Sequence, residues 1–368
     1  MIPRLFLSCG DLSGDIYAGE VIRSLRQRVP QVEIVALGGE ACAENGATLL
    51  ANTTRISTVG FVELFRSLSQ WWTIWKLTTT TLCEHSFSVL LLIDNPGFNL
   101  RLARFAQSMG LPVVYFVPPQ VWVWGRRRGR TLAQCADWIL PIFPWEEEYF
   151  RGGKARVEWV GHPLVELWRE RGQRKTKKEE SLLLLLPGSR RQEVERYLAV
   201  MRRCFVRFPS FFSSYRLVAV AASGALFSII EEYFQGFPVL IEEREKLPFL
   251  LEQTSLAISC AGTVTLEVAL AGVPQIIVYR ASPLTFLLGR WLVYGHLIGL
   301  PNIAMGEEVF PELVQYQFSP EQLTAAMEKL ATPFYEERAK GVAAALRMKL
   351  DKGNPFARVA EVLMHYFG

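Results

Sequence analysis

Short apolar segments alternate along this chain with longer segments whose apolar residues recur every three or four positions. In the first half, the short segments predict strands at residues 4–8, 33–37, 89–93, 112–117, 138–141 and 158–160. In the second half, they predict strands at residues 182–186, 217–221, 239–241, 256–259 and 275–279. The longer segments predict helices, most clearly at residues 16–28, 99–109 and 193–208. This alternation is typical of parallel sheets with helices on both faces.

The alternation is interrupted at residues 169–180, which are polar and highly charged. We interpret this segment as a solvated linker. The predicted fold class is therefore α/β, with two Rossmann-like parallel-sheet lobes at residues 1–168 and 181–335 and a cleft between them. The tail is predicted to be helical, and a helix at residues 340–368 is expected to pack back on the first lobe. Ligands of such sheets bind at the carboxyl ends of the strands.

The composition narrows the class of protein. With 368 residues, 50% of them hydrophobic and 21% charged, the chain can build two cores and is not extensively disordered. A net charge of +4 does not indicate a nucleic-acid partner. The six cysteines have no CxxC spacing and the four histidines no HxxxH pair, so reduced thiols and no metal site are expected. The start of the chain resembles a strand rather than a signal peptide, and no apolar run reaches 18 residues, so we expect a cytoplasmic protein.

Two polar turns follow predicted strands of the first lobe. Residues 8–15, SCGDLSGD, match neither a dinucleotide fingerprint nor a P-loop, but their glycines permit close backbone approach. Ser13 and Asp15 are candidate helix N-caps or sugar contacts, whereas Asp11 lies too early to be an obvious cap and is the better functional candidate. Asp94 ends a buried strand before a Pro-Gly turn, which suits a general base. The alternative is that Asp94 or Asn99 caps the next helix.

Two turns of the second lobe combine small residues with the start of a helix. They supply the candidates Gly188, Ser189, Arg190, Gly262, Thr263 and Glu267. Small residues and a helix N-terminus bring backbone N–H groups close to an anion, and an arginine adds a fixed positive charge. Glu267, in the first turns of the second helix, could accept hydrogen bonds from ribose hydroxyls. The two turns predict a nucleotide or diphosphate site, with an ordinary strand-to-helix turn as the alternative.

Trp122 and His162 are further candidates in the first lobe. Trp122 lies in an aromatic stretch before the basic residues 126–130, which could meet phosphate or form a solvated helix start. His162 lies at a strand end before a proline. It could polarise a substrate oxygen or be a hydrogen-bonded histidine between the lobes.

Two amphipathic stretches, residues 60–77 and 283–293, combine aromatic residues with arginine or lysine. Core packing is the usual explanation, but interfacial helices have the same pattern. For the second stretch we favour core packing. For the first we favour membrane or acyl-chain contact, through Phe61, Phe65, Trp71, Trp72 and Trp75.

Taken in order, these motifs resemble the lipid-A-disaccharide synthase family, inverting glycosyltransferases of the GT-B fold (glycosyltransferase family 19). The resemblance covers nearly the whole chain. It rests on residues 10–15 (GDLSGD), 59–63 (VGFVE), 93–99 (IDNPGFN), 121–124 (VWVW), 160–162 (VGH), 186–190 (LPGSR), 262–267 (GTVTLE), 279–280 (YR), 300–302 (LPN) and 312–315 (ELVQ). Each motif is short, and their shared order makes the match specific.

The resemblance implies that UDP-2,3-diacylglucosamine donates its sugar to the 6-hydroxyl of 2,3-diacylglucosamine 1-phosphate (lipid X). The products are the β-1,6-linked lipid A disaccharide 1-phosphate, formed with inversion, and UDP. Asp94 aligns with the proposed base, and Asp11 and Ser13 with the catalytic loop of the first lobe. The resemblance adds Tyr279, Arg280, Asn302 and Gln315 to the residues expected to bind the nucleotide. It assigns Asn99, Trp122 and His162 to the acceptor side or to the region between the lobes.

The resemblance also implies no metal and no cofactor. It implies peripheral association with the cytoplasmic surface of the inner membrane, because both substrates are lipids. Nucleic acid is not an expected partner, and a homodimer stays open beside a monomer.

The chain departs from the family pattern at three places. Gly97 replaces a usual aspartate, Pro118-Pro119-Gln120 replaces Ser-Pro-Ser, and Gly38-Gly39-Glu40 lacks the usual Pro-Arg-Met. We expect these changes to affect the acceptor and the acyl chains rather than the fold or the nucleotide chemistry. The alternative functions are another UDP-sugar enzyme of the same fold, such as a UDP-N-acetylglucosamine 2-epimerase, and a peripheral membrane protein without catalysis.

Overall fold

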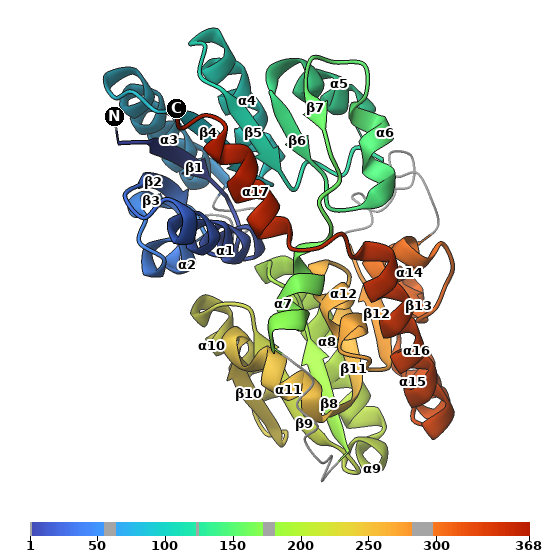
Figure 1. The fold of residues 1–368 in the computed structure, drawn as a ribbon. Coiled ribbons are helices and arrows are strands. Elements are labelled where there is room, and N and C mark those ends of the chain that lie inside the picture. The colour runs from blue at the N-terminus through green and yellow to red at the C-terminus, as the bar shows by residue number, and fades with distance from the viewer. Residues whose placement is uncertain (1, 55–63, 123–124, 172–180, 282–296) are drawn as a thin grey trace. The chain divides into compact units, whose positions relative to one another are not determined.

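The computed structural model describes residues 2–54, 64–122, 125–171, 181–281 and 297–368. These residues form two compact units (Figure 1). The first unit comprises Met1–Glu166 together with Leu350–Gly368, and the second comprises Leu167–Lys349. Each unit contains one parallel sheet, as the alternation of strands and helices predicts.

The sheet of the first unit has seven strands in the order β3-β2-β1-β4-β5-β6-β7. Their bounds are β1 (Arg4–Ser8), β2 (Glu33–Gly38), β3 (Thr48–Asn52), β4 (Val89–Ile93), β5 (Val113–Phe116), β6 (Trp138–Leu140) and β7 (Arg156–Val157). The strand order reverses direction between β1 and β4, which lie side by side with Ser8 opposite Leu92.

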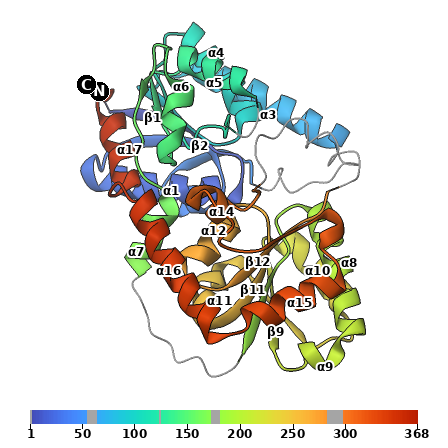
Figure 2. The ribbon, with the colours of Figure 1, turned by 90° about the vertical axis from the view of Figure 1, so that its right-hand side faces the viewer.

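The helices of the first unit are α1 (Leu12–Arg28), α2 (Glu40–Glu44), α3 (Leu64–Glu84), α4 (Pro96–Ser108), α5 (Arg126–Cys135), η2 (Pro144–Glu146), α6 (Glu147–Phe150) and α17 (Pro355–Met364). Ile74 of α3, Leu102 of α4 and Leu132 of α5 share one apolar cluster with the strands. The C-terminal α17 lies beside α1 in both views (Figures 1 and 2), and the rings of Tyr17 and Phe356 are 6.4 Å apart.

The sheet of the second unit has six strands in the order β10-β9-β8-β11-β12-β13. Their bounds are β8 (Leu182–Leu186), β9 (Arg216–Ala221), β10 (Val239–Glu243), β11 (Thr254–Cys260), β12 (Gln275–Tyr279) and β13 (Glu312–Val314). The helices are α8 (Arg191–Arg207), α9 (Pro209–Phe212), α10 (Gly224–Phe234), η3 (Arg244–Lys246), α11 (Leu247–Gln253), α12 (Thr263–Leu270), α14 (Leu300–Met305), η4 (Gln315–Gln317) and α15 (Pro320–Leu330). Two helices cross the boundary between the units, α7 (Pro163–Arg171) and α16 (Pro333–Leu350).

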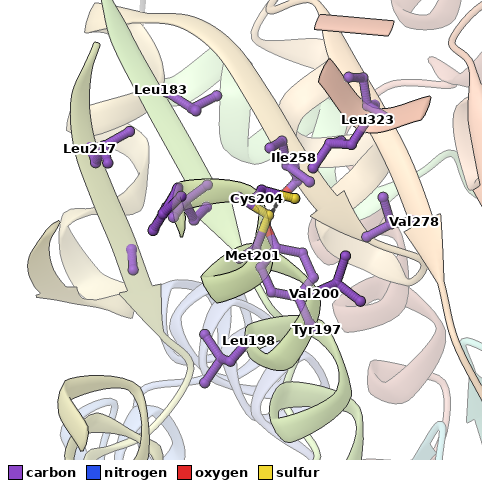
Figure 3. Close-up of a cluster of buried hydrophobic side chains, with 14 of the residues drawn as sticks. Leu183, Tyr197, Leu198, Val200, Met201, Cys204, Leu217, Ile258, Val278 and Leu323 are labelled. Carbon is purple, nitrogen blue, oxygen red and sulfur yellow. Dashed lines mark hydrogen bonds between the residues drawn. The ribbon is translucent and has the colours of Figure 1, made fainter. Parts of the chain in front are cut away.

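The central strand β8 consists of five leucines and is buried on both faces, as strands of parallel sheets with helices on each side are. Leu183 packs in a cluster with Tyr197 and Cys204 of α8, which Figure 3 shows between the helix and the strands. Leu184 faces the other cluster, with Leu247 of α11. Burying each such leucine contributes about 2 kcal/mol, so β8 anchors the sheet whose ends carry the candidate site.

Most predicted strands are confirmed, and four of them, 4–8, 89–93, 182–186 and 275–279, have the predicted bounds. The sequence did not predict the edge strands β3 and β13, and it placed β7 two residues too late. Glu158, taken as the start of that strand, instead forms a double hydrogen bond with Arg358 of α17, at 2.9 and 2.8 Å.

The predicted C-terminal helix at residues 340–368 is wrong in its extent. The chain forms two helices there, α16 and α17, and only residues 350–368 belong to the first unit. Gly353 has a φ of +93° and Pro355 is the first residue of α17, so one continuous helix cannot form across them.

Candidate active site

The candidate turns lie at one position in each sheet. In a doubly wound sheet, ligands bind at the carboxyl ends of the two neighbouring strands where the strand order reverses. In the first unit these strands are β1 and β4, which lead into the turns at Asp11 and Asp94. In the second unit they are β8 and β11, which lead into the turns at Gly188 and Gly262. The sheet topology therefore selects the same four turns as the sequence.

Asp94 adopts a backbone conformation that is rare for a non-glycine residue. Its φ is +48°, and Asn95 follows with a φ of +44°. Such strain persists only where surrounding contacts enforce it, and it is concentrated at functional sites. Two donors hold the Asp94 carbonyl, the Tyr115 hydroxyl at 2.5 Å and the Asn99 side-chain amide at 2.8 Å. The partly exposed Asp94 is thus fixed on a rigid strand end.

Asn99 lies beneath Asp94 and is fully buried. Its oxygen accepts a hydrogen bond from the Ser8 hydroxyl at 2.7 Å, and its amide donates to the carbonyls of Ser8, Ile93 and Asp94. Asn95 occupies the N-cap position of α4, so the alternative that Asp94 or Asn99 caps this helix is wrong. Because Asn99 is 0% exposed, it positions Asp94 and does not itself contact an acceptor in this conformation.

The turn after β1 is also ordered by side chains. Asp11 is the N-cap of α1 and accepts a hydrogen bond from the Gly14 amide at 2.7 Å, so the prediction that Asp11 is not a cap is wrong. Ser13 lies in the first turn of α1 and is partly exposed. At Gly10, an added Cβ would lie 2.3 Å from Nδ2 of Asn95, so the turns after β1 and β4 pack directly together.

Asp15 is neither an N-cap nor an accessible sugar contact. It is 2% exposed and accepts hydrogen bonds from the amides of Gly39 at 2.6 Å and Ala41 at 2.9 Å. Asp15 therefore ties α1 to the loop that follows β2.

The fold brings Cys9, Asp15 and Cys42 together, with possible ligand atoms all within 4.8 Å of one another. Spacing in the sequence gives no sign of this group. The Asp15 oxygens already accept backbone hydrogen bonds, and the Cys9 thiol donates to the Leu37 carbonyl at 3.5 Å. The neighbouring Cys42 thiol and burial raise the pKa of Cys9 well above its usual value, whereas metal binding requires thiolates. We assign no metal to this group.

Glu146 is a buried carboxyl in the segment after β6, and it was not among the residues predicted from the sequence. It accepts hydrogen bonds from the Trp122 indole at 2.9 Å, from the Phe143 amide at 3.1 Å and from the Ile142 amide at 3.2 Å. Burial raises the pKa of Glu146 to about 7, although these three hydrogen bonds oppose the shift. Glu146 is the first of three consecutive glutamates that follow the apolar residues 141–145, so the sequence does not distinguish it from its neighbours. Trp122 is thereby oriented by a side chain that is itself fixed.

His162 lies in a packed position. It is 2% exposed, its Nδ1 accepts a hydrogen bond from the Leu164 amide at 3.2 Å, and its ring lies 5.0 Å from that of Phe143. Burial lowers the pKa of His162 to about 3, so the ring is neutral. These contacts favour a hydrogen-bonded structural histidine over a group that polarises a substrate oxygen.

The two candidate turns of the second unit are neighbours, because β8 and β11 pair with Leu186 opposite Ser259. Gly188 has a φ of +107°, a conformation that favours glycine, and a Cβ added there would lie 3.4 Å from Sγ of Cys260 at the end of β11. Both turns lead directly into helices, α8 and α12, whose N-terminal amides attract anions. The Arg190 side chain is 74% exposed and pairs with Glu193 at 2.9 Å.

Glu267 is 2% exposed and lies in the second turn of α12. Its carboxylate accepts a hydrogen bond from the Arg244 guanidinium at 2.5 Å. Arg244 comes from the segment after β10, and no motif in the sequence points to it.

The side chains of Asn302 and Gln315 form hydrogen bonds within the second unit. Asn302 is fully buried, accepts hydrogen bonds from the amides of Val309 and Phe310, and donates to Glu312 at 2.8 Å. These bonds hold the segment that leads into β13, and the contact of Asn302 with the nucleotide stays a prediction. Gln315, with a φ of +56°, accepts a hydrogen bond from the Ala281 amide at 3.1 Å.

Tyr279 and Arg280, at the end of β12, are partly buried. Burial raises the pKa of the Tyr279 hydroxyl, so this side chain is a neutral hydrogen-bonding group at neutral pH.

Helix α3 divides its tryptophans between two faces. The ring centroids of Trp71 and Trp75 lie 5.2 and 5.8 Å from that of Phe98 in α4, so these two residues contribute to the core rather than to an exposed surface. Trp72 is 59% exposed, and the Lys76 ammonium lies 3.6 Å from the centre of its ring. Phe61, the side chain of Phe65 and residues 283–293 lie outside the described part of the chain. Within that part, no helix is both long enough and apolar enough to cross a bilayer.

Comparison with known proteins decides the family. The sequence model of the lipid-A-disaccharide synthetase family matches residues 5–351. The chain belongs to this family. Among its relatives, the lipid-A-disaccharide synthase of Myxococcus xanthus is 31% identical over 98% of this chain and 97% of that protein. The enzyme of Trichlorobacter lovleyi is 33% identical over 89% of this chain and 88% of that protein.

Solved structures show the same fold at low identity. A Staphylococcus aureus MnaA–UDP complex has a TM-score of 0.67 at 11% identity, covering 99% of this chain and 97% of that one. Acinetobacter baumannii MurG has a TM-score of 0.60 at 14% identity, covering 99% of both chains. A putative UDP-N-acetylglucosamine 2-epimerase from Listeria monocytogenes has a TM-score of 0.69 at 12% identity, covering 100% and 97%. These matches confirm the predicted GT-B fold, and the far higher identity to synthases disfavours the epimerase alternative.

Proposed function

We propose that this family member transfers the sugar of UDP-2,3-diacylglucosamine to the 6-hydroxyl of 2,3-diacylglucosamine 1-phosphate. The observation that carries the proposal is the family match over residues 5–351. The strained turn at Asp94 supports it, because two hydrogen bonds to its backbone carbonyl fix a carboxylate-bearing residue at the ligand-binding end of a sheet.

In the proposed reaction Asp94 is the general base. Its carboxylate accepts the proton of the acceptor 6-hydroxyl as that oxygen attacks C1 of the donor sugar. The bond between C1 and the diphosphate oxygen breaks, and its electron pair leaves with UDP. A single displacement inverts the configuration at C1. Tyr115 and Asn99 keep the base in position, which matters because small displacements of a catalytic group are costly.

The second unit is the proposed site of UDP. The amides at the N-termini of α8 and α12, the hydroxyls of Ser189 and Thr263, and the exposed Arg190 would meet the diphosphate and the charge that develops on it. Glu267 is proposed to bind the ribose. On the first unit, Asp11, Ser13 and Trp122 are proposed to contact the acceptor side of the reaction.

The direct test is incubation of the purified protein with both lipid substrates, followed by measurement of UDP release and mass spectrometry of the lipid product. We expect one UDP for each disaccharide. Asp94→Asn should lower kcat by about 100-fold or more, which is the usual contribution of a general base. The exposed Glu148→Gln is the matched control and should leave kcat unchanged. Absence of the disaccharide with the unaltered protein would reject the proposed function.

We further propose that the outer face of α3 contacts the cytoplasmic surface of the inner membrane. Trp72 and Leu77 are exposed and Lys76 lies over the Trp72 ring, a combination that suits the boundary between head groups and acyl chains. Trp72→Ser should weaken flotation with anionic liposomes, whereas Tyr316→Ser, which removes an aromatic ring that is 84% exposed in the second unit, should not. Equal flotation of the two variants would contradict this surface.

A further inference from the structure

The carboxylate of Glu267 is buried and has a charged partner. It lies on α12, four residues after the first helical position Thr263, and is 2% exposed. Burying a carboxylate without a counter-charge is very costly. The Arg244 guanidinium supplies one at 2.5 Å and is itself 22% exposed. The pair is therefore largely buried, and the arginine is its more exposed member.

The position of Arg244 is fixed by its own segment. It is the first residue of η3, directly after β10, and η3 leads into α11. Leu247 and Leu251 of α11 pack in the same apolar cluster as Val268, the residue next to Glu267. This packing holds the start of α11 against α12, so the guanidinium reaches the carboxylate from a rigid base.

The two basic residues of η3 have different partners. Lys246, two residues further on, pairs with the surface residue Glu242 at 2.6 Å and is 60% exposed. Arg244 alone of these two cations turns inward. A guanidinium also suits the task better than an ammonium, because its planar set of donors fixes the orientation of a carboxylate.

We propose that Arg244 is a positioning residue of the nucleotide site, which holds the Glu267 carboxylate in the orientation that binds the ribose hydroxyls of a uridine nucleotide. This inference rests on the proposed function. An ionised carboxylate has about four lone-pair positions, so it can accept from Arg244 and from a ribose diol at the same time. The competing explanation is an ion pair that only joins η3 to α12.

Binding of UDP and of 2′-deoxy- and 3′-deoxy-UDP to the full-length protein, measured by calorimetry, separates these explanations. The unaltered protein should bind UDP about 10-fold more tightly than at least one deoxy analogue, because that analogue lacks a hydrogen bond to a charged group. Glu267→Gln should remove most of this discrimination. Arg244→Gln should weaken UDP binding by about 10-fold and reduce the discrimination as well. Lys246→Gln is the matched control and should change neither quantity.

Kinetics and a conservative variant complete the test. Arg244→Gln should raise the KM for the UDP-sugar while kcat changes little, and Arg244→Lys should recover part of the affinity. A folded Arg244→Gln protein that keeps both UDP affinity and ribose discrimination would overturn the inference. If Arg244→Gln does not fold, full ribose discrimination in Arg244→Lys would overturn it instead. Failure of the unaltered protein to bind UDP would reject the proposed function itself, a different and distinguishable outcome.

Discussion

The indole of Trp122 donates a hydrogen bond to the buried carboxyl of Glu146 at 2.9 Å. Two backbone amides bond the other carboxyl oxygen, so Glu146 links the segment after β5 to the segment after β6. The rings of Phe143 and Trp145 stack with centroids 4.7 Å apart beside this link. The proposed acceptor-side residue Trp122 is thus held by a titratable group.

Glu146 should make stability depend on pH. Its folded pKa of about 7 lies above the ordinary 4.5, so its stabilising contribution is complete below pH 4.5 and is lost as pH rises through 7. Glu146→Gln cannot titrate. The unaltered protein should therefore exceed this variant in unfolding free energy by more at pH 5 than at pH 8, with a difference of at most about 3 kcal/mol. Denaturant unfolding at both pH values measures it, with the exposed Glu148→Gln as control. A pH-independent gap would contradict the prediction.

His162 should act in the opposite direction. Its folded pKa of about 3 lies below the ordinary 6.5, so its contribution is complete above pH 6.5 and is lost as pH falls toward 3. His162→Gln should be less stable than the unaltered protein at pH 7.5, because it loses the contact with Phe143. That deficit should shrink by about 2 kcal/mol by pH 5. Between pH 4.5 and 6.5, the stabilising contribution of Glu146 falls as pH rises, whereas that of His162 increases, so the two oppose each other in the unaltered protein. The pH dependence due to Glu146 should therefore be seen most clearly in His162→Gln, and that due to His162 in Glu146→Gln. A deficit that stays constant across this range would show that His162 is not held neutral.

The sequence predicted the sheets well because their strands are continuous apolar runs. The run Leu182–Leu186 can be a strand only if both faces are covered, and this sets the layer order around it. The short edge strand Glu312–Val314 has no such run, and its position depends on pairing with β12. The strands that the sequence missed are therefore those whose identity comes from a neighbouring strand.

The sequence located the turns that carry the candidate residues, but not the contacts that each side chain makes. A polar residue after a buried strand marks the carboxyl edge, and this located Asp94 and Glu267. Whether such a residue contacts a ligand or supports one that does depends on burial, which the local sequence does not show. Asn99 and Asn302 look like Asp94 in the sequence, yet both are fully buried and bonded to backbone groups. Arg244 and Glu146 were missed because their partners lie 23 and 24 residues away.

The hydroxyl of Tyr115 should matter more for rate than for binding. Tyr115→Phe removes one of the two donors that hold the strained Asp94 carbonyl. We expect kcat to fall by about 10- to 100-fold with KM nearly unchanged, because the base loses its position. Stability should fall by about 1 kcal/mol.

Tyr197→Phe is the matched control for Tyr115→Phe. It removes an equally buried hydroxyl, which donates to the Ile258 carbonyl at 2.8 Å in the core of the second unit. Its stability loss should be similar, while kcat should stay the same. If both variants lose activity in parallel with stability, Tyr115 has no special effect on Asp94.

Alanine substitutions at the two glycines next to the Asp94 turn should have opposite effects on stability. At Gly10 a Cβ would lie 2.5 Å from Cγ of Asn95, so Gly10→Ala must displace the turn that carries Asp94 and should cost about 1–3 kcal/mol as well as activity. At Gly97 a Cβ would meet no atom within 4 Å, so Gly97→Ala in α4 should be neutral or stabilise by up to about 1 kcal/mol.

Asn95→Gly removes the side chain that clashes in Gly10→Ala, and glycine tolerates the φ of +44° at that position. Adding it to Gly10→Ala should therefore restore stability, and a double variant as unstable as Gly10→Ala alone would show that the clash lies elsewhere.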